Sequence, residues 1–320
     1  MAVHAFGDSV TQYIAASDAA HGFVALLATA LGVAITNHGT SGDMVADGSA
    51  KVYGVTPGSG DKFTIMFGIN DERIYGVDAT KQSYYRRGLQ CLIAYLATGT
   101  KQLAVSNGSY TGSWSATGVF GLGKSSNTNG STAQFTVSGS TVYVGMIQQD
   151  SAPGTYDIQI DGSTIGSFTT QTTGLATVNG VTYGARLHRF SGLSSGSHTV
   201  KIIVTSTTGG GNQVYVDWVA GSSQTIKPNV YVGNVIKAQA YSSGGSDANV
   251  ASYNVDVAAL VSELQSDGLN VRMVDVLSVL NYSVDMDGAY HPVNSGHAKL
   301  EVAFFAAFNG PPPRVFGMMV

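Results

Sequence analysis

The two ends of the chain alternate between short apolar runs and longer segments with helical apolar spacing. The short runs have the length and apolar content of buried strands, and the longer segments repeat apolar residues three and four positions apart. Such strands, alternating with helices, predict a parallel sheet that is covered on both faces. Strands are expected at 3–7, 33–37, 63–68, 230–236 and 270–276, and helices at 18–31, 78–97, 247–267 and 294–308.

The middle of the chain, from about 108 to 223, has a different texture. Gly, Ser and Thr dominate it, and short alternating runs are bounded by turn residues, which is typical of a β-sandwich. Asp161-Gly162 follows one of these runs and predicts a hairpin turn. Strands are expected here at 133–137, 141–144, 156–160, 198–204 and 214–219.

The sequence therefore predicts two domains. An α/β domain is expected from 1–107 and 225–320, with an all-β insert at 108–224 between its third and fourth strands. The proline run at 311–313 is expected to end the fold.

Four short polar motifs lie in order within the two α/β segments. They are Gly-Asp-Ser at 7–9, Asn-His-Gly-Thr-Ser-Gly at 37–42, Gly-Ile-Asn-Asp at 68–71 and Asp-Gly-Ala-Tyr-His-Pro at 287–292. Because the carboxyl ends of parallel strands share one edge of a sheet, the first three motifs are expected to meet there. A serine nucleophile needs a base, an acidic residue that orients the base, and donors for an oxyanion, and the motifs contain these groups.

Together the motifs resemble those of the SGNH (GDSL-type) hydrolase family of serine esterases. The resemblance covers the two outer segments and implies a three-layer α/β/α flavodoxin-like fold. It implies that Ser9 is the nucleophile and His291 the base. It also implies an oxyanion hole formed by the backbone N–H groups of Ser9 and Gly42 and by the side-chain amide of Asn70.

The acidic partner of His291 departs from the family pattern. The family usually places its Asp three residues before the His, and Gly288 occupies that position here. Asp287 lies four residues before His291 and is the favoured partner. Asp285 is one alternative, and a Ser-His dyad whose ring is oriented by a backbone carbonyl is another.

The insert resembles galactose-binding-type jelly rolls, which often accompany carbohydrate-active enzymes. Binding of a sugar would need exposed aromatic residues, and Tyr110 and Trp114 are candidates for substrate contacts. His38, beside the oxyanion glycine, is a third candidate. A rigid spacer or pocket wall is an equally good interpretation of the insert. The stretches that carry the resemblance are 156–162, 192–200 and 215–218.

Composition and residue spacing limit which kinds of partner and cofactor the protein is expected to bind. The formal net charge is -4 and no basic stripe is present, which argues against nucleic acid as a partner. The histidines show no metal-ligand spacing, so we expect neither a metal nor another cofactor. No apolar run approaches the roughly 20 residues of a membrane span. A Gly/Ser/Thr-rich chain with 11% charged residues and no visible secretory leader suggests an extracellular protein or part of a larger surface or phage tail protein.

These observations predict a serine ester hydrolase that forms an acyl-enzyme. A carbohydrate O-acetylesterase is favoured, with an acetylated polysaccharide as substrate, because the insert and the hydroxyl-rich composition suit sugars. Two other functions are left open. One is a glycan- or receptor-binding protein with a decayed site, such as a phage tail fibre or a surface adhesin. The other is a lipase or thioesterase of the same fold.

Overall fold

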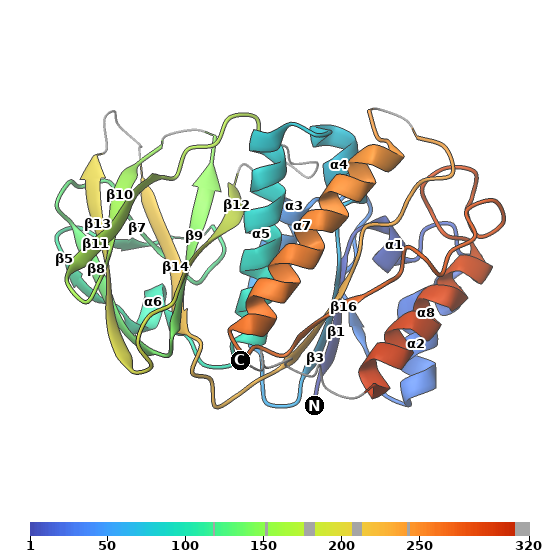
Figure 1. The fold of residues 1–320 in the computed structure, drawn as a ribbon, viewed down its shortest axis with the longest axis horizontal. Helices are drawn as coiled ribbons and strands as arrows, with labels where there is room; N and C mark the ends of the chain where they lie inside the picture. The colour runs from blue at the N-terminus through green and yellow to red at the C-terminus, as the bar shows by residue number, and fades with distance from the viewer. Residues whose placement is uncertain (118, 151–152, 176–182, 207–212, 242–243, 311–320) are drawn as a thin grey trace, which may run out of the picture.

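The protein has an α/β part at one end of its long axis and two antiparallel sheets at the other (Figure 1). The computed structural model describes residues 1–117, 119–150, 153–175, 183–206, 213–241 and 244–310. The proline run expected to end the fold lies outside these residues. Within the described ranges, none of the helices combines the length and hydropathy that a membrane crossing requires.

The α/β part is built on a five-stranded sheet in which all neighbouring strands are parallel. The strand order is β16-β15-β3-β1-β2. In chain order this is the 2-1-3-4-5 arrangement of flavodoxin-like doubly wound sheets. The predicted parallel sheet is confirmed. Its strands are β1 (Val3–Gly7), β2 (Thr36–Asn37), β3 (Lys62–Met66), β15 (Asn229–Gly233) and β16 (Val271–Val274).

Helices cover both faces of this sheet (Figure 1). Phe63 and Ile65 of β3 pack with α3, α5 and α7, whereas Met66 packs with α2 and α8, because successive strand side chains point to opposite faces. The helices are α1 (Ser9–Gln12), the 3-10 helix η1 (Ala19–His21), α2 (Phe23–Leu31), α3 (Val45–Tyr53), α4 (Ile69–Tyr75), α5 (Ala79–Ala97), α7 (Asp247–Ser266) and α8 (Asn294–Asn309).

Several element boundaries differ from the sequence prediction. The helix expected at 18–31 is two elements, because Gly22 has extended backbone between η1 and α2. In the strand expected at 33–37, only the last two residues pair. The third strand ends at Met66, and Gly68, with φ +131°, begins the unpredicted helix α4. Asn70 therefore lies in the first turn of a helix rather than in a loop. Helix α3 was not predicted either.

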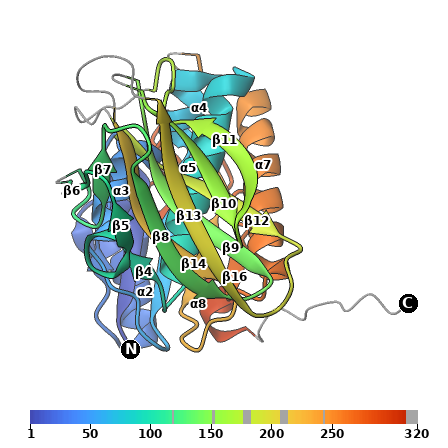
Figure 2. The same cartoon turned by 90° about the vertical axis from the view of Figure 1, so that its left-hand side faces the viewer.

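The insert contains two antiparallel sheets that share one core (Figure 2). The first has the order β11-β10-β13-β8-β5; the second has the order β12-β9-β14-β7-β6, with β4 also paired to β14. The elements are β4 (Gln102–Leu103), α6 (Ala104–Asn107), β5 (Ser109–Thr111), β6 (Ser115–Ala116), β7 (Lys124–Ser126), β8 (Thr132–Ser138), β9 (Thr141–Gln149), β10 (Thr155–Ile160), β11 (Ser163–Thr169), β12 (Tyr183–Ser191), β13 (Ser197–Ser206) and β14 (Val214–Gly221).

The Asp161-Gly162 hairpin is confirmed. Ile160 pairs with Ser163, and both loop residues have positive φ, at 51° and 83°. A two-residue loop with both φ angles positive matches the right-handed twist of the strands that it joins. The jelly-roll connectivity and the domain boundaries at 108 and 224 stay predictions.

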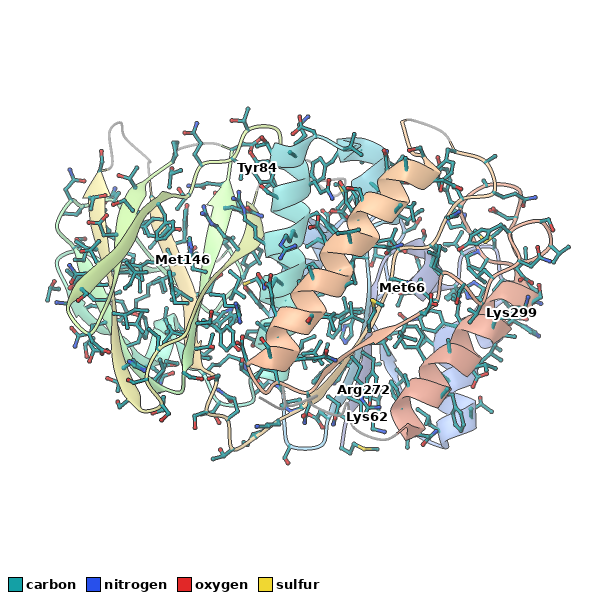
Figure 3. All side chains as sticks on the ribbon, in the orientation of Figure 1. Lys62, Met66, Tyr84, Met146, Arg272 and Lys299 are labelled. Atoms are coloured by element: carbon teal, nitrogen blue, oxygen red, sulfur yellow. The ribbon has the colours of Figure 1, made fainter. Side chains whose placement is uncertain are left out.

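The insert is packed firmly on the α/β part. Tyr143, Leu187 and Trp218 on its second sheet belong to the same buried cluster as helix α5. Trp218 is fully buried and its indole N–H donates to the Tyr53 hydroxyl at 3.2 Å. Figure 3 labels one buried side chain on each side of this junction, Met146 between the insert's sheets and Met66 under α8.

Asp217 is an unusual buried residue of β14. Its side chain is 0% exposed, and neither carboxylate oxygen has a hydrogen-bond partner among the described residues. Burial raises the pKa of Asp217 to about 8, because the charged form loses its hydration without compensation. The carboxyl group is therefore neutral in the folded protein at pH values where an unfolded chain has released the proton.

This difference predicts that stability falls as pH rises. The folded pKa lies above the unfolded one, so the stabilisation is complete below about pH 4 and is lost progressively up to about pH 8. Asp217→Asn, which cannot ionise, should remove a pH-dependent loss on the order of a few kcal/mol between about pH 5 and pH 8. Urea unfolding at several pH values measures the effect.

Asp157→Asn is the matched control, because Asp157 is partly exposed on β10 and accepts a hydrogen bond from Ser167. It measures how far the loss of a partly exposed aspartate by itself changes the slope of stability against pH. An identical slope for Asp217→Asn and the wild type would show that Asp217 is not neutral in the folded state.

Candidate active site

Ser9 lies where the first strand turns into a short helix. Asp8 caps that helix, since its carboxylate accepts the Val10 N–H at 3.0 Å, and Ser9 is the first helical residue. The N–H of a first-turn residue has no acceptor within its own helix. The backbone N–H of Ser9 is therefore available to a bound oxygen.

The structure brings three of the predicted residues into a hydrogen-bonded chain. The Nε2 atom of His291 lies 3.1 Å from the Ser9 hydroxyl oxygen, across 282 positions of sequence. The Nδ1 atom of the same ring lies 3.1 Å from a carboxylate oxygen of Asp287. The side chains of His291 and Asp287 are about a quarter exposed, so the site is open to solvent. This geometry lets a proton pass from the hydroxyl to the ring.

Gly288 lies between Asp287 and His291 and has φ +91°, a backbone conformation that favours glycine. The Asp287 N–H donates to the His291 carbonyl at 2.9 Å, and the other carboxylate oxygen of Asp287 accepts the N–H groups of Ala289 and His291. Burial raises the pKa of Asp287, but these hydrogen bonds and the His291 ring outweigh it and bring the pKa below its usual value. Asp287 is therefore ionised at neutral pH.

Asp285 has different partners. Its buried carboxylate accepts hydrogen bonds from Lys299 and Ser295 of α8 and from the backbone N–H of Asn281, at 2.5, 2.8 and 2.7 Å. Lys299 lies near the start of α8 (Figure 3). These bonds tie the loop to the helix, and the structure places Asp287 rather than Asp285 against the His291 ring.

The loop after β2 is anchored beside Ser9. Thr40 donates its N–H to the Gly7 carbonyl at 3.2 Å, and Ser41 donates to the Gln12 side chain at 2.6 Å. Gly42 follows with φ +85°, a conformation that favours glycine. The loop thus presents backbone without a Cβ atom close to the end of the first strand.

Asn70 is held at both ends of its side-chain amide. Its Nδ2 donates to the Asp43 carbonyl at 3.0 Å, which joins it to the Gly42 loop. Its Oδ1 accepts from Arg73 Nη2 at 3.0 Å. One Nδ2 proton is free of these two bonds. Sequence reasoning missed Arg73; the spacing of three from Asn70 would have indicated it if helix α4 had been predicted.

The three candidate substrate contacts, His38, Tyr110 and Trp114, have no hydrogen bond to Ser9, His291 or Asp287 among the described residues. His38 Nε2 lies 3.0 Å from the nearer ring nitrogen of His4, and its ring stacks on Phe6 with centroids 4.5 Å apart. Burial, with the His4 and Lys51 charges, lowers the pKa of His38 to about 4. Tyr110 and Trp114 pack against the insert core, and the strand β5 that carries Tyr110 lies at the opposite end of the molecule from α1 (Figure 1).

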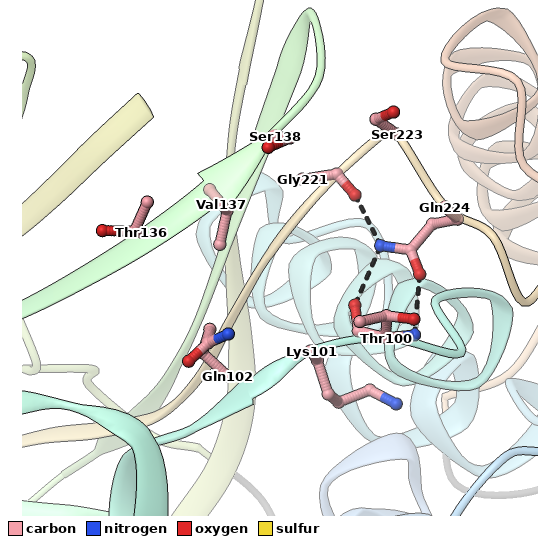
Figure 4. A pocket seen from close by; sticks show the side chains of 9 residues that line it. All are labelled: Thr100, Lys101, Gln102, Thr136, Val137, Ser138, Gly221, Ser223 and Gln224. Carbon is pink, nitrogen blue, oxygen red and sulfur yellow. Dashed lines mark hydrogen bonds between the residues drawn. The ribbon is translucent and has the colours of Figure 1, made fainter. Parts of the chain in front are cut away.

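Two cavities are lined mainly by residues of the insert, and Ser9 lines neither of them. One, of about 190 Å³, has the Gln224 amide on one side, bonded to Thr100 and Gly221 at 2.7 to 2.9 Å (Figure 4). The other, of about 400 Å³, is lined mainly by serine and glycine residues of the sandwich loops, together with Asp267. Among the described residues, no group of three or more His, Cys, Asp or Glu side chains is placed to hold a metal ion.

Comparison with known proteins places the chain in no family. No family model matches the sequence, and no curated protein matches it. Among solved structures, a member of the lipolytic protein G-D-S-L family from Veillonella parvula is 13% identical, with 96% of each chain covered and a TM-score of 0.46. A two-domain esterase active on acetylated mannans is 11% identical, covering 69% of this chain and 90% of its own, with a TM-score of 0.39.

Another solved structure resembles a smaller part of the chain. A CBM36 carbohydrate-binding module, solved with calcium and xylotriose, is 20% identical over 38% of this chain and 97% of its own, with a TM-score of 0.30. The identities and TM-scores of all three structures are low.

The bonding of the two aspartates predicts different effects of their removal. Asp287→Asn should slow the reaction of Ser9 with a fluorophosphonate probe by 100-fold or more, on the order of the effect of losing a triad carboxylate. Asp285→Asn, the matched control, should lower the melting temperature and leave the labelling rate of the folded protein within a few fold. The reverse pattern would assign the partner of His291 to Asp285.

Proposed function

We propose that this protein is a serine ester hydrolase, and that its natural substrate is an O-acetylated polysaccharide. The observation that carries the proposal is the continuous chain of hydrogen bonds from Ser9 through His291 to Asp287, with both contacts at 3.1 Å. A serine, an imidazole and an ionised carboxylate in this order are the groups that acyl transfer needs.

The first half of the reaction forms an acyl-enzyme. His291 Nε2 accepts the Ser9 proton as the hydroxyl oxygen bonds to the ester carbonyl carbon, and Asp287 stabilises the resulting imidazolium. The negative charge on the carbonyl oxygen is met by the N–H groups of Ser9 and Gly42 and by the Asn70 amide. The tetrahedral intermediate collapses as its bond to the alcohol oxygen breaks and His291 protonates that oxygen.

The second half restores the enzyme. His291 takes a proton from a water molecule, whose oxygen attacks the acyl carbon of the Ser9 ester. The same donors stabilise the second oxyanion. When this intermediate collapses, the proton returns to Ser9 and the carboxylic acid leaves. Each cycle consumes one ester and one water molecule, releases the alcohol and the acid, and regenerates Ser9 and His291.

The preference for an acetyl group on a carbohydrate rests on two features. An acetyl group needs only a small acyl pocket, and a chain rich in Gly, Ser and Thr with 11% charged residues suits contact with neutral sugars. The β insert fixed to α5 gives the protein a second rigid surface beside the α/β part. An extracellular or virion-surface location would follow from such a substrate.

Hydrolysis of p-nitrophenyl acetate, butyrate and octanoate tests the proposal. The wild type should prefer acetate, and Ser9→Ala should lose about 1,000-fold or more in turnover because the nucleophile is gone. Ser17→Ala, which removes a serine hydroxyl bonded to Asn294 rather than to His291, should keep full activity.

The other outcomes separate the alternatives. A preference for octanoate would indicate a lipase or thioesterase. A wild type no faster than Ser9→Ala on every ester, with no acetate released from acetylated polysaccharides, would indicate a glycan-binding protein with a decayed site.

A further inference from the structure

Arg73 connects two parts of the candidate site that are distant in sequence. Its Nη2 atom donates to Asn70 Oδ1 at 3.0 Å, one turn earlier on α4. Its guanidinium carbon lies 5.1 Å from the ring centroid of Tyr290, the residue before His291. In the described ranges Arg73 has no ion pair with a carboxylate. The side chain thus touches both the proposed oxyanion donor and the loop of the proposed base.

The contact with Asn70 determines which end of the amide faces the substrate. A guanidinium has donors only, so the atom it meets must be Oδ1, and the Asp43 carbonyl is an acceptor, so the atom it meets must be Nδ2. An amide turned over would direct oxygen lone pairs at the developing oxyanion and repel it. Arg73 therefore selects the orientation that leaves an N–H for the substrate.

The positive charge also strengthens the donor. A cation bonded to an amide oxygen polarises the group and makes its N–H a better hydrogen-bond donor. The oxyanion gains from the charge itself as well, because the Coulomb energy between them favours the transition state over the neutral ester. A neutral side chain of the same length provides neither effect.

We propose that Arg73 is a positioning residue for ester hydrolysis, which orients and polarises the Asn70 amide and holds the His291 loop against it through Tyr290. The proposal rests on the esterase function proposed above. Arg73 does not touch the reacting atoms. It acts mainly through the Asn70 amide, and its charge and its contact with Tyr290 contribute less.

Arg73→Met and Arg73→Lys test the proposal with p-nitrophenyl acetate, a neutral substrate. Loss of one oxyanion donor costs roughly 100- to 1,000-fold in turnover, so weakening a donor should cost less. Arg73→Met should lower kcat by about 10- to 100-fold with KM nearly unchanged, since the lost interaction exists mainly in the transition state. The kcat of Arg73→Lys, which keeps the charge but loses the planar guanidinium, should lie between those of the wild type and Arg73→Met.

The affinity for a boronic acid inhibitor, which forms a tetrahedral adduct with Ser9, distinguishes a positioning residue from a purely structural one. Replacing a purely structural residue would not change this affinity in the folded protein. The affinity for the inhibitor should fall across the variants in proportion to kcat/KM, while the affinity for an unreactive neutral amide analogue of the ester stays constant. Active-site titration normalises each rate to folded, competent protein. Arg86→Met is the matched control; it removes ion pairs to Asp256 and Glu263 on α7, so it should lower stability and leave kcat unchanged.

A double-mutant cycle asks whether Arg73 acts through Asn70. In the Asn70→Ala background, Arg73→Met should reduce kcat by less than about threefold, because the amide that it orients is gone. Fully additive effects would overturn the proposal, as would Arg73→Met with wild-type kcat on a neutral ester. The latter result, with Ser9-dependent activity intact, would leave the esterase function standing. Absence of Ser9-dependent hydrolysis in the wild type would overturn both.

Discussion

The parallel register of β1 and β3 is the constraint on which the candidate site depends. Gly7 pairs with Met66, so the segments that carry Ser9 and Asn70 leave the sheet at the same level of one edge. The bond from Thr40 to the Gly7 carbonyl brings the Gly42 loop to that edge as well. Ser9, Gly42 and Asn70 are thus brought together by backbone pairing, before any of their side chains interact.

The insert does not interrupt the parallel sheet, because the chain that follows it forms the next strand of the same sheet. It departs after α5 and returns to β15, which pairs directly with β3. The entropic cost of closing a loop rises only slowly with the length of the loop, so a long insertion between two strands is tolerated. The insert also packs on α5 through Leu187 and Trp218, and α5 belongs to the same buried cluster as the central strands β3 and β15.

Sequence patterns predicted the sheet, the long helices and the Ser9–His291 pair, because apolar periodicity and short motifs are local signals. They missed α4 because a helix of seven residues, Ile69–Tyr75, has little periodicity to detect. The partner of His291 depends on loop geometry at Gly288, which spacing alone does not fix. Tyr110 and Trp114 were candidate sugar contacts, yet they pack at the insert core, since aromatic residues serve cores and sugar sites alike.

The segments that carry Ser9 and Asn70 also hold buried carboxyl groups, and their protonation matters to an oxyanion. Burial raises the pKa of Asp8 and of Glu72 to about 7, and Arg73 opposes both shifts. In its neutral form each carboxyl adds no negative charge to the site, so it does not offset the positive charge of the Arg73 guanidinium. As pH rises past these values, each carboxylate that forms opposes a developing oxyanion. How strongly the site stabilises an oxyanion therefore depends partly on the burial of carboxyl groups that do not touch the substrate.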